Sequence, residues 1–140
     1  MKILYETEAV STGGRNGHVQ VQNSPLSFNM AVPKEMGGNK AEGVNPEQLF
    51  AAGYSACFGS ALKHVIRVKK LHMASPDVHV TVGIGTNDEG GFFLAVEILA
   101  VFTGIDQDTA DRLANEAHQV CPYSNATRGN IEVNVTARVE

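Results

Sequence analysis

A long helix with small or apolar residues on every side is the feature of this sequence that most constrains the fold. Asn45 is a good N-cap, Pro46 suits the first helical position, and Gln48 completes a capping box. The helical pattern continues to about Lys70, and its first half is apolar or small all round. Because a helix of this kind must be surrounded by protein, we expect it to be a central element.

Alternating apolar and polar residues predict strands on both sides of this helix in the sequence. Three strands are expected before the helix, over residues 2–10, 18–22 and 26–32. Residues 12–17 are rich in types that tolerate positive φ, and they are expected to form the loop of the first hairpin. Residues 33–44 show no sustained period, which predicts a long connecting loop.

The remainder of the sequence predicts a second hairpin, a second helix and a final strand. Residues 78–84 and 94–102 alternate on either side of a turn. A helix with one buried stripe begins near Asp106 and ends at Pro122, and residues 131–139 alternate again. Because no strand–helix–strand unit repeats, this order indicates an α+β fold rather than a doubly wound sheet.

The chain is long enough to form a core without cross-links. Its 140 residues, 43% hydrophobic and 19% charged, are typical of one globular domain, here residues 1–140. The net charge of −4 comes from scattered acidic residues and leaves no basic stripe, which argues against a nucleic-acid partner. The uncharged stretch 48–62 is too short and too polar to span a membrane. The first residues do not form a secretory signal, so we expect a cytoplasmic protein.

Because the chain does not need a cross-link for stability, its two cysteines require another explanation. Cys57 lies in the middle of the long helix among small residues, which would let a second helix approach closely. Cys121 lies on the buried stripe of the second helix, and Pro122 after it predicts a position in the last turn or just beyond. Two cysteines in a reducing cytosol are catalytic, redox-cycling or simply buried, and spacing alone leaves these alternatives open.

A thiol in the middle of a helix needs a nearby cation to ionise, because the helix dipole fades beyond the first turn. Arg15, in a glycine-flanked loop, is a candidate, although a solvated turn arginine is the simpler interpretation. Glu47 lies about 15 Å from Cys57 along a continuous helix, which is too far for contact. Glu47 therefore acts through Arg15, comes from a second subunit, or is only an acid favoured by the helix dipole.

The sequence contains no pattern typical of a metal site or of a phosphate-binding loop. The five histidines show no metal-ligand spacing with one another and no CxxC partner, so no metal site is expected. The glycine-rich segments 13–17 and 87–91 lack the strand-to-helix setting of a phosphate-binding loop and are interpreted as turns.

Three motifs occur together: TGGRNG at 12–17, NPEQLFAAGYSACF at 45–58 and VCPYSNATRGN at 120–130. Their combination resembles the organic hydroperoxide resistance proteins, a branch of the larger family that contains the osmotically inducible thiol peroxidases. The resemblance runs essentially from end to end, and Ser55 stands where the family more usually has alanine. The fold that the resemblance implies has antiparallel sheets wrapped around central helices in an intertwined homodimer, with sites at the subunit interface.

The resemblance implies a thiol-dependent peroxidase that needs no metal or organic cofactor. Cys57 matches the peroxidatic cysteine and Cys121 the resolving cysteine. Arg15 matches the activating arginine and Glu47 its carboxylate partner. The implied substrates are organic hydroperoxides, including lipid hydroperoxides, and the implied reductants are dithiols or lipoylated proteins.

The implied reaction begins when the Cys57 thiolate attacks the peroxide and becomes a sulfenic acid, which Cys121 then converts to a disulfide. Two other interpretations remain. A redox-sensing or ligand-binding dimer would form the same disulfide without rapid turnover, and a structural domain would carry two inert buried cysteines. The three differ in hydroperoxide consumption by the wild type and by variants that lack either cysteine.

Overall fold

The computed structural model describes residues 1–39 and 42–140. The chain divides into two compact units, an N-terminal unit (Met1–Leu49) and a C-terminal unit (Phe50–Glu140). Helix α1 (Pro46–Val68) begins in the last residues of the N-terminal unit and continues through the first part of the C-terminal unit.

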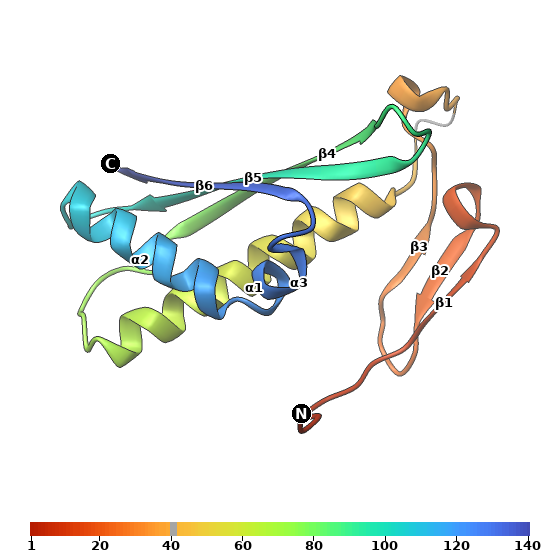
Figure 1. The fold of residues 1–140 in the computed structure, drawn as a ribbon. Coiled ribbons are helices and arrows are strands. Elements are labelled where there is room, and N and C mark those ends of the chain that lie inside the picture. The colour runs from red at the N-terminus through yellow and green to blue at the C-terminus, as the bar shows by residue number, and fades with distance from the viewer. Residues whose placement is uncertain (40–41) are drawn as a thin grey trace. The chain divides into compact units, whose positions relative to one another are not determined.

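The N-terminal unit contains a small antiparallel sheet in the order β1-β2-β3 (Figure 1). The elements of this unit are β1 (Ala9–Thr12), the 3-10 turn η1 (Gly14–Asn16), β2 (His18–Val21), β3 (Ser27–Asn29) and the 3-10 turn η2 (Lys34–Met36). The expected hairpin loop is confirmed, since η1 joins β1 to β2. Residues 40 and 41, which fall in the expected loop 33–44, lie outside the described residues.

The first strand is shorter than the alternation predicts. The expectation of a strand over residues 2–10 is wrong for residues 2–8, because β1 begins at Ala9. The ladder starts where Glu8 accepts a hydrogen bond from Gln22 at 2.8 Å, and the turn after β2 leaves residues 2–7 no described strand to pair with. Alternation indicates that one face of a strand is buried and the other is exposed, but a strand also needs a hydrogen-bonded neighbour.

The third strand is shorter than expected for a similar reason. Pairing with β2 stops at Asn29, and Met30 then forms an isolated parallel bridge with Val44. Met30 is buried, whereas Leu26, the residue before β3, is 50% exposed. The expected strand 26–32 is therefore divided between β3 and a bridge to the segment that precedes α1.

Helix α1 begins and ends as the local chemistry requires. The capping box is confirmed, because Asn45 Oδ1 accepts from the Gln48 amide at 2.8 Å and Gln48 Oε1 accepts from the Asn45 amide at 2.9 Å. The helix ends at Val68 rather than Lys70, since Lys70 adopts φ 56° and the Leu71 amide donates back to Ile66 at 3.1 Å. A left-handed residue of this kind closes a helix by satisfying its last carbonyls.

The C-terminal unit contains a three-stranded sheet in the order β4-β5-β6. Its elements after α1 are β4 (Asp77–Thr86), β5 (Phe92–Phe102), α2 (Gln107–Val120), α3 (Pro122–Thr127) and β6 (Glu132–Val139). The predicted hairpin is confirmed as β4 and β5. The expectation of antiparallel sheets is corrected at β6, which pairs with β5 in parallel because α2 and α3 carry the chain back along the sheet before β6 begins.

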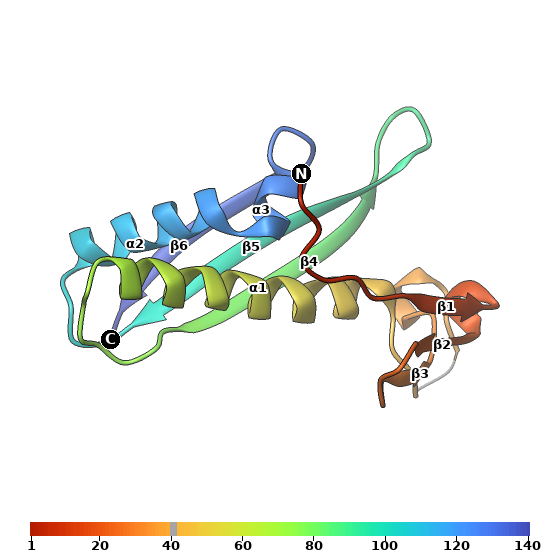
Figure 2. The same cartoon turned by 90° about the horizontal axis from the view of Figure 1, so that it is seen from below.

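The core of the C-terminal unit lies between this sheet and the helices. Figure 1 shows α1 and α2 on one face of the sheet, and Figure 2 shows the two helices side by side. One face of β5 and one face each of α1 and α2 supply the most buried side chains: Tyr54, Phe58, Leu62, Val96, Ile98, Phe102 and Leu113. The α+β architecture predicted from the order of elements is confirmed. No helix within residues 1–39 and 42–140 is long and apolar enough to cross a membrane.

Candidate active site

The structure brings the two cysteines into contact within the C-terminal unit. Cys57 lies on α1 and Cys121 lies between α2 and α3, and their sulfur atoms are 3.5 Å apart. Both are free thiols; Cys121 is fully buried and Cys57 partly exposed. A disulfide bond is about 2.05 Å long, so a two-electron oxidation accompanied by a short movement would join them.

The backbone around Cys121 explains why its thiol lies at this place. Cys121 has extended backbone (φ −65°, ψ 122°) and serves both as the C-cap of α2 and as the N-cap of α3. Its amide donates to Ala117 and its carbonyl accepts from Asn125, each at 2.9 Å. Pro122 prevents α2 from continuing and begins α3, as proline at a first helical position does.

Helix α3 and the residue that follows Pro122 are the parts of this site that sequence reasoning missed. A six-residue helix is too short to give a periodic signal, although the proline at its start is one indication. Tyr123 lies against Gly53, where a Cβ would come within 2.9 Å of the tyrosine hydroxyl. Gly53 is one helical turn before Cys57, so its lack of a side chain makes room for the Tyr123 ring about one turn from the thiol.

The surroundings of Cys57 hold its pKa above the ordinary value. Burial of the thiol is the largest cause, and the nearby Cys121 adds to it through a hydrogen bond and charge repulsion. The backbone amide of Tyr123 opposes the shift, because a hydrogen bond to sulfur favours the thiolate. The groups of the C-terminal unit therefore leave Cys57 mainly as a thiol at neutral pH.

Arg15 and Glu47 form a two-pronged ion pair within the N-terminal unit. Arg15 Nη1 donates to Glu47 Oε2 at 2.8 Å, and Nη2 donates to Oε1 at 2.6 Å. The side chains are 33% and 13% exposed, respectively. The hydrogen bond from Arg15 lowers the pKa of Glu47 against the opposing effect of burial, and the same bond raises the pKa of Arg15.

Glycines shape the loop that carries Arg15. Gly13 and Gly14 have φ of 84° and 56°, a region that other residues rarely adopt. A Cβ at Gly17 would come within 1.7 Å of the Thr12 carbonyl oxygen, so only glycine fits there. Glu47 is held in the first turn of α1, between the two residues of the capping box. Loop and helix start together fix both partners of the ion pair.

The four predicted site residues thus form two pairs, one in each unit. Cys57 and Cys121 meet in the C-terminal unit, and Arg15 and Glu47 meet in the N-terminal unit. Among residues 1–39 and 42–140, histidine, cysteine and acidic side chains form no group of three that could hold a metal ion.

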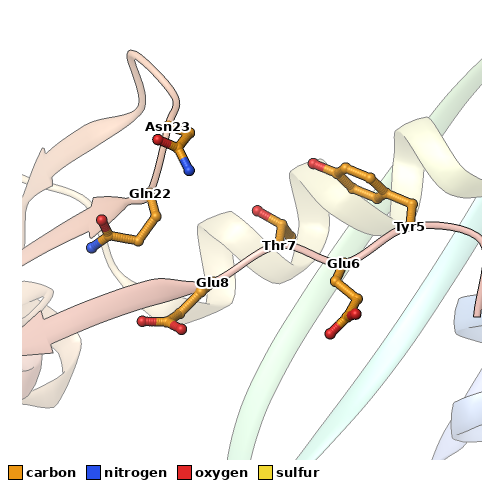
Figure 3. Close-up of a pocket in the computed structure, with 6 residues that line it drawn as sticks. All are labelled: Tyr5, Glu6, Thr7, Glu8, Gln22 and Asn23. Atoms are coloured by element: carbon orange, nitrogen blue, oxygen red, sulfur yellow. The ribbon is translucent and has the colours of Figure 1, made fainter.

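An open cleft in the N-terminal unit has a different character from either pair. Figure 3 shows that its side chains do not converge on a common point. The cleft is lined by Tyr5, Glu6, Thr7, Glu8, Gln22 and Asn23. It contains none of the predicted site residues and no cation that could bind an anion, so we assign it no chemistry.

Comparisons with known proteins agree on one family. The profile of a family described as OsmC-like protein matches residues 37–136. An organic hydroperoxide resistance protein-like 2 of Staphylococcus epidermidis is 45% identical over 138 residues, 96% of this chain and 97% of the relative. An organic hydroperoxide resistance protein of Xanthomonas axonopodis pv. citri is 46% identical over 136 residues, 96% of this chain and 95% of the relative.

A solved structure gives the same result. The crystal structure of an organic hydroperoxide resistance protein from Elizabethkingia anophelis, with crystallant-derived thiocyanate bound, is 51% identical to this chain. The match covers 100% of both chains with a TM-score of 0.95. The resemblance seen in the three sequence motifs is therefore confirmed by sequence and by fold.

Proposed function

This chain belongs to the OsmC-like protein family, and we propose that it is a cysteine-based peroxidase that reduces organic hydroperoxides to alcohols. The observation that carries the proposal is the contact between the thiols of Cys57 and Cys121 at 3.5 Å. Two free thiols at this distance, one accessible and one buried, suit a cycle of attack and disulfide formation. The names of the relatives support a role in resistance to organic hydroperoxides.

In the proposed first step, the Cys57 thiolate attacks the distal oxygen of the hydroperoxide. A sulfur–oxygen bond forms, the oxygen–oxygen bond breaks, and the alkoxide leaves and takes up a proton to become the alcohol. The products are one alcohol and a sulfenic acid on Cys57. The partial exposure of Cys57 supports its assignment as the attacking residue, because the fully buried Cys121 is the less accessible thiol.

Arg15 is proposed to supply the positive charge that makes Cys57 a thiolate, with Glu47 as the positioning residue that holds the guanidinium. Burial and the nearby Cys121 raise the pKa of the Cys57 thiol, so a thiolate at this place needs a positive charge, which Arg15 would supply. The two-pronged pair with Glu47 supports the choice of Arg15, since such a pair fixes the direction of the guanidinium plane.

The second proposed step closes the Cys57–Cys121 disulfide, and an external dithiol or a lipoylated protein then reduces it. The cycle uses only sulfur chemistry and needs no cofactor. We propose that residues 1–140 act as one functional domain, to which both units contribute, and that the chain works as a cytoplasmic homodimer. Lipid hydroperoxides are included among the proposed substrates.

A second candidate is a redox-sensing or ligand-binding dimer that forms the same disulfide without rapid turnover. The raised pKa of Cys57 favours this alternative, because a thiol that is mostly protonated reacts slowly with peroxide. The rate of reaction with organic hydroperoxide distinguishes the two candidates.

The test measures consumption of cumene hydroperoxide with excess dithiothreitol for the wild type and for Cys57→Ser and Cys121→Ser. A peroxidase turns over many times, loses all activity in Cys57→Ser, and reacts about once per site in Cys121→Ser when small monothiols are absent. A wild type that forms the disulfide but turns over no faster than dithiothreitol alone would favour the sensor. A wild type that consumes no organic hydroperoxide would refute the enzyme.

A further inference from the structure

A cluster of buried polar side chains joins three helices next to the cysteine pair. Its members, here called the polar cluster, are Tyr54 on α1, His118 on α2, and Ser124 and Thr127 on α3. Tyr54 and Ser124 are fully buried and Thr127 is 6% exposed. None of these residues has a role in the chemistry described above, and buried hydroxyl groups are costly unless they are hydrogen-bonded.

The Ser124 hydroxyl is the centre of the polar cluster. It lies 2.9 Å from the Tyr54 hydroxyl and 2.7 Å from His118 Nδ1. The Tyr54 hydroxyl also lies 3.2 Å from Thr127 Oγ1, and Thr127 in turn donates to the Ser124 carbonyl at 3.2 Å. One set of directions satisfies every group: His118 donates to Ser124, Ser124 to Tyr54, and Tyr54 to Thr127.

The contact between Tyr54 and Ser124 in the polar cluster joins the same parts of the chain as the contact between the two cysteines. Tyr54 precedes Cys57 by three residues on α1, and Ser124 follows Cys121 by three residues into α3. The hydrogen bond between Tyr54 and Ser124 therefore ties α3 to α1 about one helical turn from the sulfur contact. Helix α3 has six residues and cannot be stable alone, so its position depends on such contacts.

We propose that the polar cluster is a positioning device for disulfide formation, which keeps Cys121 within reach of Cys57 by holding α3 against α1. The inference rests on the proposed peroxidase cycle. In the step concerned, the Cys121 sulfur attacks the sulfenic sulfur of Cys57. The sulfur–sulfur bond forms, the sulfur–oxygen bond breaks, and the departing hydroxide leaves as water with the proton of the Cys121 thiol.

The polar cluster should affect disulfide formation without affecting the first attack on the hydroperoxide. Burial lowers the pKa of His118, and the charge of Arg128 lowers it further, so the polar cluster is uncharged at neutral pH. An uncharged cluster adds no charge that would stabilise the Cys57 thiolate. Its loss should therefore slow disulfide formation and leave the reaction of Cys57 with hydroperoxide nearly unchanged.

The test compares Tyr54→Phe with the wild type and with Ser55→Ala. Phenylalanine keeps the ring packing and removes only the hydroxyl. The control removes a neighbouring hydroxyl on α1 that bonds only to its own helix, at the Ala52 carbonyl. Losing the hydrogen bonds of the Tyr54 hydroxyl to Ser124 and Thr127 lowers the equilibrium constant for docking of α3 about tenfold. The disulfide should therefore form about tenfold more slowly, and its equilibrium with dithiothreitol should shift about tenfold toward the dithiol. For a two-electron couple this shift equals about 30 mV.

Two rates are followed after mixing with one equivalent of cumene hydroperoxide: loss of peroxide, and loss of both thiols by acid quench and alkylation. A purely structural role would lower the melting temperature without changing the dithiol–disulfide equilibrium, and that outcome overturns the proposal. Wild-type disulfide kinetics in Tyr54→Phe also overturn it. Ser124→Ala provides the second variant if Tyr54→Phe does not fold.

The equilibrium with dithiothreitol requires no hydroperoxide, so it separates this inference from the proposed function. If the wild type fails to consume organic hydroperoxide, the peroxidase proposal is refuted while the equilibrium still tests the polar cluster. If the wild type turns over and Tyr54→Phe has an unchanged equilibrium, only the positioning role is refuted.

Discussion

Replacing Glu47 by glutamine tests whether the ion pair with Arg15 controls the reactivity of Cys57. The amide keeps the shape of the side chain but removes its charge. Glu47 now accepts two hydrogen bonds from the guanidinium, at 2.8 and 2.6 Å. Glutamine can accept only one, because its NH₂ group would face the second guanidinium N–H.

The size of the effect follows from the exposure of the pair. A hydrogen bond to a charged group contributes about 1.5–3 kcal/mol. Glu47 is 13% exposed, but Arg15 is 33% exposed, so solvent screening reduces the loss to about 1–1.5 kcal/mol. Because 1.4 kcal/mol is a factor of ten, the guanidinium should be held in place about tenfold less often.

If Arg15 activates Cys57, the second-order rate of the first attack on cumene hydroperoxide should fall about tenfold in Glu47→Gln. Single-turnover kinetics by peroxide loss measure this rate. The matched control is Glu116→Gln, which removes the exposed ion pair with Lys69 at 3.0 Å and should keep the wild-type rate. A wild-type rate in Glu47→Gln would refute the role of the pair, and an equal loss in both variants would show a general charge effect.

Two further predictions concern the same N-terminal unit. Because Arg15 lowers the pKa of Glu47, the pair stabilises the fold above the unfolded pKa of about 4.3, and this stabilisation is lost as the pH falls through the lower folded value. The free energy of unfolding, measured with urea, should therefore differ between the wild type and Glu47→Gln by an amount that is constant near neutral pH and shrinks below about pH 4.3. A difference that grows in acid would contradict the direction of the Glu47 pKa shift. Gly17→Ala places a Cβ 1.7 Å from the Thr12 carbonyl oxygen and should displace the Arg15 loop, with a rate loss that does not add to that of Glu47→Gln. Gly85→Ala, where a Cβ meets nothing within 4 Å, should react at the wild-type rate.

Local chemistry made the beginning of the long helix predictable. The capping box of Asn45 and Gln48 involves residues three apart, so the sequence alone contains all of its atoms. The alternation in β4 and β5 was equally informative, because each strand has one face on the core. Strand pairing was harder: residues 2–7 alternate but have no neighbour among the described strands, and the parallel place of β6 depends on the path of two helices.

The candidate site was predictable to different degrees. The positions of Cys57 and Cys121 on facing helices follow from helical spacing and from Pro122, but their 3.5 Å contact depends on how α1, α2 and α3 pack. Arg15 alone was a candidate cation with a solvated turn as the simpler interpretation, and the motif resemblance gave it a role. The polar cluster escaped sequence reasoning, because Tyr54 and Ser124 are 70 residues apart and each is unremarkable in its own segment.

The central claim is that Cys57 attacks the peroxide and Cys121 resolves the product. Mass spectrometry of the protein after one equivalent of cumene hydroperoxide tests it most directly. The wild type should lose two hydrogen atoms through a Cys57–Cys121 disulfide and release one cumyl alcohol per chain. Cys121→Ser should instead gain oxygen on Cys57. Oxidation of Cys121 alone, or release of alcohol with both thiols intact, would contradict the account.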